Sequence, residues 1–263
     1  MRRPKFWLVA VLVLGLLYSW PAFGEELDGK AIVKKMSDRA QSTSSIINAR
    51  MSIVESNNTK RVREMRIRSK KINNKNNVVT TFISPPDVRG VKFLTIENPG
   101  GDDDQRLYLP AQKRIRRITS SNKSESFMGS TFSYADLQTP STDKFDHKRL
   151  GDKSVYNQDC YTVQSAPKNA VDSEYSKIIY YVRKDNWIPI RGEFFNKDGK
   201  LWKVMDVFKM DQKPDGTWLV TQTKMADLLA NKSTWMEIND FKVNVAIDDT
   251  FFTDRFLTDE SQE

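Results

Sequence analysis

Residues 105–137 read QRLYLPAQKRIRRITSSNKSESFMGSTFSYADL, and the expected fold is built outward from this stretch. Leu107 and Leu109 alternate with more polar neighbours, which predicts a short strand with two different faces. After a tight link, residues 114–118 (RIRRI) predict a second short strand that returns beside the first. The stretch therefore predicts an antiparallel pair, followed by a polar loop and an aromatic segment.

The aromatic segment comprises residues 127–137, FMGSTFSYADL, and we call it the flap. Ser133 and Asp136 have the spacing of a capping box, which predicts a short helix from Tyr134 to just before Pro140. Such a helix is too short to be stable alone, so its apolar side chains must contact something else. Two interpretations stay open: the flap plugs one end of an ordinary core, or it is a mobile cover over an apolar cavity.

The N-terminus has the three parts of a secretory signal peptide. Basic residues come first, an apolar run from Phe6 to Trp20 follows, and small residues end at Gly24. We expect residues 1–24 to be a signal peptide cleaved near Gly24, and residues 25–263 to form a single domain. The apolar run is too short and wrongly flanked to favour a membrane-spanning helix, and an uncleaved anchor is the alternative.

The charge of the chain is mildly basic. Cleavage would remove three of the 42 basic residues and none of the 34 acidic ones, which leaves a net charge of about +5 from the formal +8. These charges are mixed along the sequence, so they argue against a nucleic-acid partner. They suit a weak attraction to an anionic membrane surface.

Strand patterns dominate the rest of the chain. Residues 27–39 predict one amphipathic helix, and about eleven strands with short, turn-rich connections follow. Residues 140–148 look polar and irregular, and the aromatic tail over residues 250–257 is expected to pack back on the sheet. The predicted class is α+β, mostly β: a long, curled antiparallel sheet in an open half-barrel, with helices and the flap covering its concave face.

Groups for catalysis are scarce in this sequence. The one histidine, His147, lies in a polar run and is predicted to be a solvated loop residue rather than a base. The one cysteine, Cys160, lies on an alternating strand and is predicted to be a small buried hydrophobe. The run Asp102-Asp103-Asp104 could attract calcium but lacks EF-hand spacing, so a solvated turn is favoured. We therefore expect no metal, no cofactor and no enzymatic activity.

Alternation places several large apolar residues on the face that the flap would cover. Each could simply fill a core, but together they could line a cavity for a ligand. The predicted cavity and flap residues are Phe93, Leu107, Leu109, Phe127, Met128, Phe132, Tyr134, Leu137, Phe194, Trp202 and Met205.

The basic strand carries Arg114, Arg116 and Arg117. One interpretation assigns these arginines to docking on anionic headgroups or on an acidic protein partner. The other is a solvated edge strand whose charges prevent aggregation. Alternation places Arg114 and Arg116 on the face of Ile118, and Arg117 on the opposite face with Ile115.

The pattern RLYLPAQKRIRRI followed by FMGSTFSYADL resembles the LolA-like family of outer-membrane lipoprotein-sorting proteins, in particular the branch associated with RND-type lipid exporters. The resemblance extends over about residues 29–257. It implies the LolA/LolB-like half-barrel and a periplasmic carrier that binds acyl chains of a lipoprotein or lipid and shuttles them toward the outer membrane. An inner-membrane transporter, of the RND type in this branch, is the implied donor, and we expect transient membrane contact, a monomer and no nucleic acid. The alternative is a non-enzymatic envelope sensor or scaffold on the same fold that binds a protein partner.

Overall fold

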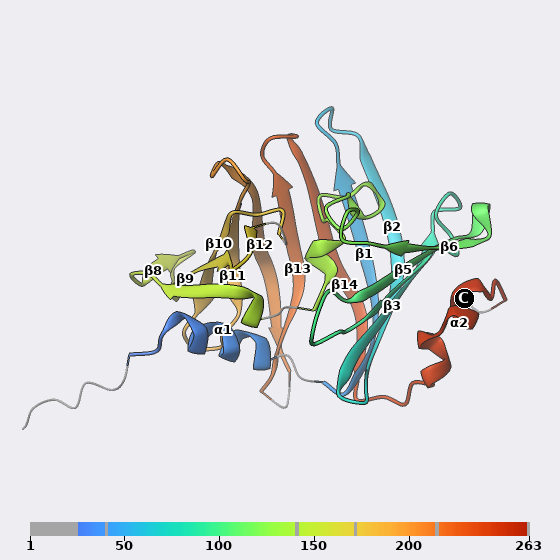
Figure 1. Ribbon diagram of the computed structural model, residues 1–263, viewed down its shortest axis with the longest axis horizontal. Helices are drawn as coiled ribbons and strands as arrows, with labels where there is room; N and C mark the ends of the chain where they lie inside the picture. The colour runs from blue at the N-terminus through green and yellow to red at the C-terminus, as the bar shows by residue number, and fades with distance from the viewer. Residues whose placement is uncertain (1–25, 40–41, 140–141, 171–172, 214–215, 262–263) are drawn as a thin grey trace, which may run out of the picture.

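The computed structural model describes residues 26–39, 42–139, 142–170, 173–213 and 216–261, so the expected cleavage near Gly24 lies outside the described residues. Fourteen strands form one antiparallel sheet in the order β6-β5-β4-β3-β2-β1-β14-β13-β12-β11-β10-β9-β7, with β8 paired to β9 (Figure 1). The strands are β1 Ser44–Val54, β2 Lys60–Ile72, β3 Lys75–Ser84, β4 Lys92–Ile96, β5 Asp104–Leu109, β6 Arg114–Ile118, β7 Phe145–Arg149, β8 Lys153–Val155, β9 Gln158–Pro167, β10 Lys177–Arg183, β11 Pro189–Phe195, β12 Leu201–Gln212, β13 Trp218–Asp227 and β14 Lys232–Val243.

The sheet is open, because its end strands β6 and β7 pair with one neighbour each. It curls toward the face that carries helix α1 (Gly29–Asp38) and the flap, which we call the concave face (Figure 1). The predicted mostly-β half-barrel with a helix and a flap on this face is confirmed. No helix in the described part of the chain is long and apolar enough to cross a membrane.

Helix α1 forms where the sequence predicts it. Asp28 caps its first turn by accepting a 2.7 Å hydrogen bond from the Ala31 amide. Its apolar side, with Ile32 and Val33 buried, packs on β9 and β10. At its start, a Cβ on Gly29 would lie 2.7 Å from the His147 backbone, so only glycine allows this close approach to β7.

The C-terminal tail covers the opposite face of the N-terminal half of the sheet. The short helix α2 (Asp254–Thr258) brings Phe256 and Leu257 onto buried residues of β3, β4 and β5. Lys92, which is itself buried, donates a 3.0 Å hydrogen bond to the Phe256 carbonyl. The expectation that this aromatic tail packs back on the sheet is confirmed.

The strand count and the prediction for residues 145–149, which include His147, need correction. The structure has fourteen strands rather than about eleven, and two of the additional strands are β7 and β8. Residues 145–149 were expected to be irregular but form β7, where half-buried residues alternate with exposed ones and no apolar pattern marks the strand. His147 is therefore not a solvated loop residue: it lies on β7, with Ser165 Oγ 2.8 Å from Nδ1 and the Thr142 carbonyl 2.9 Å from Nε2.

Candidate functional site

The flap is anchored on the concave face by aromatic rings. Phe127 lies with its ring centroid 5.1 Å from that of Phe93 on β4 and 5.9 Å from that of Phe82 on β3. Tyr134 completes the group, 5.5 Å from Phe93 and 5.7 Å from Phe127. Such tilted and edge-to-face pairs stabilise contacts beyond the area they bury. These rings fix the flap to the N-terminal half of the sheet.

The predicted cavity and flap residues come together on this face in two neighbouring clusters. Phe93, Leu107, Phe127 and Tyr134 are buried in the first, with Leu109, Met128 and Leu137 packed around them. The second surrounds buried Phe194 on β11, with Trp202 and Met205 of β12 packed against it. Phe132 packs against both clusters and joins them. The sequence thus identified side chains that share one surface, which extends across both halves of the sheet.

Hydrogen bonds fasten the middle of the flap to the centre of the sheet. The Thr131 amide donates to Thr234 Oγ1 of β14 over 2.9 Å, and Thr131 Oγ1 donates to the Met225 carbonyl of β13, also over 2.9 Å. Arg63 on β2 donates to the Met128 carbonyl. Met128 and Gly129 have φ values of +50° and +72°, so the chain makes a tight left-handed turn here that suits glycine at the second position.

A buried polar cluster fixes the far end of the flap to the C-terminal half of the sheet, and we call it the latch. Its members are Ser133 and Asp136 of the flap, Glu174 and Tyr175 before β10, and Lys203 of β12. Lys203 Nζ donates to the Tyr175 hydroxyl over 2.9 Å and lies 3.5 Å from Asp136 Oδ2 and 3.9 Å from Glu174 Oε2. The Tyr175 hydroxyl in turn donates to Asp136 Oδ1 over 2.8 Å.

The predicted capping box lies inside this latch. The Ser133 amide donates to Asp136 Oδ2 over 2.8 Å, and the Asp136 amide lies 3.2 Å from Ser133 Oγ, as the reciprocal pattern requires. The Ser133 hydroxyl donates to Glu174. A short 3₁₀ turn, Ala135–Leu137, follows where the short helix was expected.

Burial dominates the electrostatics of the latch. The side chains of Lys203, Asp136 and Glu174 are 4%, 8% and 7% exposed, so one cation compensates two carboxylates away from water. Burial raises the pKa of the Glu174 carboxyl; the Lys203 charge lowers it less strongly, and the Asp136 charge adds to the increase. Burial also raises the pKa of the Tyr175 hydroxyl well above its ordinary value, so it stays a donor.

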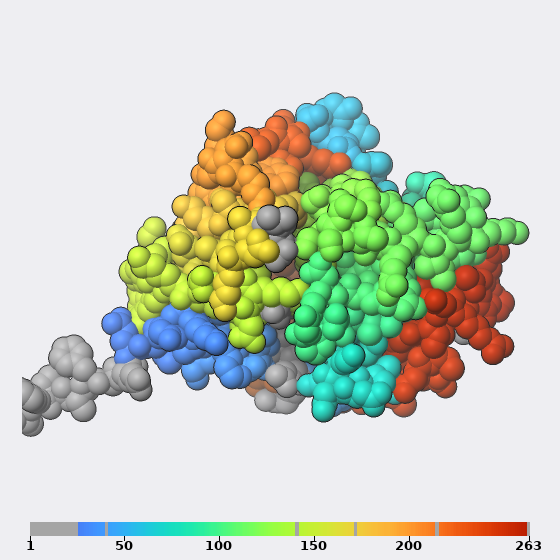
Figure 2. Space-filling model, in the orientation of Figure 1, coloured from blue at the N-terminus to red at the C-terminus, as the bar shows by residue number. Residues whose placement is uncertain are grey.

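Pockets formed by the described residues lie beside the flap and beyond it. One of about 530 Å³ opens between the flap side and the β11–β12 turn, where Lys123, Ala135, Glu174, Lys197 and Trp202 are among the lining residues. In the space-filling view, the green segment that ends with the flap and the yellow strands form separate parts of the front face (Figure 2). A smaller cavity of about 140 Å³ lies where β13 and β14 diverge, with apolar lining that includes Ile47, Val220 and Met236.

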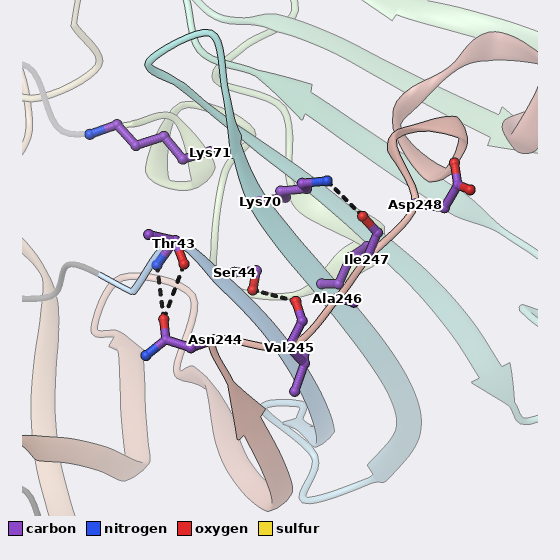
Figure 3. Close-up of a pocket in the computed structure, with 9 residues that line it drawn as sticks. All are labelled: Thr43, Ser44, Lys70, Lys71, Asn244, Val245, Ala246, Ile247 and Asp248. Atoms are coloured by element: carbon purple, nitrogen blue, oxygen red, sulfur yellow. Dashed lines mark hydrogen bonds between the residues drawn. The ribbon is translucent and has the colours of Figure 1, made fainter.

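A third pocket, of about 620 Å³, lies at one end of the central strands of the sheet, where β1 begins and β14 ends. Its polar groups bind each other: Lys70 Nζ donates to the Ile247 carbonyl over 2.7 Å, and Ser44 Oγ donates to the Val245 carbonyl over 2.6 Å (Figure 3). Lys71 points away from these residues (Figure 3). These contacts hold the tail against the sheet, so the residues of this pocket have a structural role.

Comparison with known structures identifies the fold. A crystal structure from Vibrio parahaemolyticus, described as an outer membrane lipoprotein-sorting protein domain, is 30% identical with a TM-score of 0.83, and the match covers 88% of this chain and 98% of that one. The chain belongs to the LolA-like outer membrane lipoprotein-sorting family. A DUF1329 family protein from Desulfovibrio piger is 28% identical with a TM-score of 0.83, over 87% of this chain and 97% of that one.

A further structure agrees on the fold of this LolA-like protein. A LolA superfamily protein from Nitrosomonas europaea is 18% identical with a TM-score of 0.70, over 88% of this chain and all of the other. A family model described as that of an uncharacterized protein matches residues 74–259. A search of curated proteins gave no match.

The predicted docking arginines of this LolA-like protein lie on β6, an end strand of the sheet. The pairing of β5 and β6 is regular, without a bulge, from Gln105 opposite Ile118 to Leu109 opposite Arg114. Arg116 forms a 2.6 Å ion pair with Glu125, just before the flap, and Arg117 forms a 3.0 Å ion pair with Asp104. Arg114 is exposed at the start of the strand. Two of the three charges are therefore partly engaged within the chain.

The acidic run is not a solvated turn, which corrects the sequence prediction. Asp102 binds Lys123 and Lys144, each over 3.1 Å, and so holds the loop before the flap. Asp103 is buried and accepts hydrogen bonds from the Asn98 and Thr139 amides at 3.1 and 2.7 Å. Each of these two carboxylates is thus committed to structure. Among the described residues, no group of three or more acidic, histidine or cysteine side chains could hold a metal ion.

The cysteine prediction is confirmed, because Cys160 is free and fully buried. Sequence reasoning missed Glu174, Tyr175 and Lys203 as partners of the flap. The available signal was the capping box itself, which marked Ser133 and Asp136 as polar residues in an otherwise apolar segment. No comparable sequence pattern identified Lys203 of β12 as a buried residue.

Proposed function

We propose that this LolA-like protein is a periplasmic carrier that binds acyl chains of a lipoprotein or lipid on its concave face and shuttles them toward the outer membrane. The observation that carries the proposal is the flap. It covers an apolar surface that extends over both halves of the sheet, and it is held there by non-covalent side-chain contacts, which can break and re-form. We also propose export to the periplasm with cleavage near Gly24, which the basic, apolar and small-residue parts of the N-terminus support, and a monomeric mature domain.

Flap side chains occupy the space that an acyl chain would take. Burying a chain of about sixteen carbons yields roughly 12 kcal/mol at about 0.8 kcal/mol per methylene, and a membrane offers the same gain. When the flap moves aside, the acyl chain covers the apolar surface that Phe127 and Phe132 covered before. The acyl chain therefore offsets the apolar part of the cost of opening, and the polar contacts of the flap set the part that remains. Met and aromatic linings suit this use because they adapt to chains of different shape.

A reversible lock of the flap tests this proposal. The Thr131 amide lies 2.9 Å from Thr234 Oγ1, so the flap backbone contacts β14 here, and the double variant Thr131→Cys/Thr234→Cys is designed to join the flap to β14 by a disulfide. We expect the reduced protein to take up a fluorescent fatty acid and the oxidised protein to take up far less. The reduced form is the matched control, because it has the same sequence.

Two outcomes would contradict the proposal in different ways. Equal uptake in both redox states would mean that the flap does not gate the site. Absence of acyl uptake by the wild type, together with lipid-free protein and a tightly bound protein partner on purification from its own host, would favour the sensor or scaffold function.

We further propose that Arg114, Arg116 and Arg117 contact anionic headgroups or an inner-membrane transporter, of the RND type in the branch that the sequence resembles. The exposed position of Arg114 on an end strand supports this use. Arg114→Gln/Arg116→Gln should weaken vesicle or transporter binding mainly at low salt, because each surface charge contributes on the order of 1 kcal/mol and is screened. Unchanged binding with increased aggregation would instead identify an edge-protection role.

A further inference from the structure

The turn between β13 and β14 exposes two adjacent leucines. Leu228 and Leu229 are 50% and 61% exposed, although most large apolar side chains of the described chain are covered. Single exposed apolar residues are ordinary on protein surfaces, but a pair at the tip of a hairpin is a small apolar protrusion. This protrusion has no role in the flap or in the core.

The tip is rigid rather than loose. One Asp227 oxygen accepts hydrogen bonds from the Leu229 and Ala230 amides at 3.0 and 2.9 Å, and the other accepts from Trp202 Nε1 at 3.0 Å. The Leu228 amide donates to the Trp202 carbonyl over 2.8 Å. The backbone of the two leucines is therefore already ordered before any partner binds, so binding through them costs little conformational entropy.

The tip also lies at the end of the molecule where a pocket opens. Because neighbouring strands are antiparallel, the β13–β14, β1–β2 and β11–β12 turns lie at the same end of the sheet, at the top of Figures 1 and 2. Trp202, which holds the tip, also lines the 530 Å³ pocket beside the flap. Exposed lysines flank the tip on the two neighbouring turns, at positions 60, 197 and 200.

We propose that the Leu228–Leu229 tip is a membrane-docking element that inserts into the interface of an anionic bilayer. Two side chains are too small an area for a stable protein interface, but they suit insertion among lipid headgroups and acyl chains, and the surrounding lysines attract anionic lipid. Docking through the tip places the mouth of the neighbouring pocket against the membrane surface. The docking itself does not depend on the carrier function; only its use in cargo transfer rests on the function proposed above.

Vesicle sedimentation of the mature chain tests this inference. Vesicles of phosphatidylethanolamine and phosphatidylglycerol are compared with pure phosphatidylcholine, for the wild type and for Leu228→Ser/Leu229→Ser. We expect the double variant to bind the anionic vesicles at least about tenfold more weakly, because the apolar contribution to insertion is lost. The matched control is Val243→Ser, which changes a 45% exposed side chain at the opposite end of β14 and should alter binding less than about twofold.

The inference is overturned if the wild type does not sediment with anionic vesicles, or if the double variant binds as well as the wild type. Equal losses in the double variant and in Val243→Ser would also overturn it, since general hydrophobicity would then explain binding. Leu229→Ser alone provides a milder change if the double variant is poorly folded. Fatty-acid uptake measured on the same proteins separates the two proposals: the double variant should keep uptake, and a wild type that docks without uptake would refute only the carrier.

Discussion

Replacing Lys203 with Met should release the flap. Lys203 is the cation that faces both latch carboxylates, at 3.5 Å from Asp136 and 3.9 Å from Glu174. Methionine has a similar length but no charge, so packing on β12 is largely kept while both carboxylates lose their counterion. The effect should therefore come from electrostatics rather than from a cavity.

The expected magnitude follows from burial. Removing one partner of a buried ion pair costs about 3–5 kcal/mol, because the remaining charge stays uncompensated in a poorly solvated place. The loss has an upper limit here: a detached flap carries Asp136 into water, so the cost cannot exceed the free energy of opening the flap. If the flap stays closed, we expect the unfolding free energy to fall by about 3 kcal/mol. If the flap opens, we expect a smaller fall in unfolding free energy.

Urea unfolding followed by tryptophan fluorescence, combined with limited proteolysis of the flap, distinguishes these cases. Lys209→Met is the matched control on the same strand, because Lys209 is 65% exposed and its ion pair with Asp211 spans 3.8 Å. It should cost less than about 1 kcal/mol and leave proteolysis unchanged. Adding Asp136→Asn and Glu174→Gln to Lys203→Met should recover much of the stability. If Lys203→Met matches Lys209→Met in both assays, the latch does not hold the flap.

Three further outcomes follow from the same contacts. Glu174→Gln should be more stable than the wild type at neutral pH, because the pKa of the Glu174 carboxyl is raised in the folded state. As the pH falls, folded wild type takes up a proton on Glu174 more readily than unfolded wild type does, so its stability rises toward that of the variant. Urea titrations of both proteins at neutral and at acidic pH measure this difference in unfolding free energy. Phe127→Ala should lower the unfolding free energy by about 3–5 kcal/mol or open the flap, because Phe127 is buried. The control Phe208→Ala, at an exposed position, should lower it by less than about 1 kcal/mol. Urea unfolding and limited proteolysis measure both effects. Thr131→Val should cost about 1–2 kcal/mol and Thr131→Ser much less, because only serine keeps the donor to the Met225 carbonyl.

The parts of the fold that have a regular apolar pattern could be predicted from the sequence. Three segments each have apolar residues on one side only, and each packs through that side as expected. They are the strand with Leu107 and Leu109, the helix at residues 29–38 and the aromatic tail. Strand β7 was missed for a physical reason. It lies at an edge and is no more than half-buried, so its sequence, FDHKR, carries no apolar alternation. Its pairing with β9 depends on the rest of the sheet.

The candidate site divides in the same way. Its apolar members, such as Phe93 and Phe127, could be predicted because burial selects large apolar residues wherever they face the core. The latch could not be predicted. Ser133, Glu174 and Lys203 are separated by some tens of residues, and they meet only because the sheet register brings β12 next to β11 and the flap crosses to it. A buried lysine looks, in sequence, like any solvated lysine on a strand.

The flap is held by two chemically different kinds of contact, and an acyl chain can compete with only one of them. At Phe127 the flap is held by apolar contact with Phe82 of β3 and Phe93 of β4, and an acyl chain can replace this contact with another of the same kind. At Asp136 the flap is held by charge and hydrogen bonds to Tyr175 and Lys203, and a hydrocarbon offers no substitute for them. A cargo that enters under the aromatic end would therefore lift that end first, while the latch acts as the hinge. If the latch stays closed during such a movement, the flap would open away from β3 and β4, because the latch lies on the C-terminal half of the sheet.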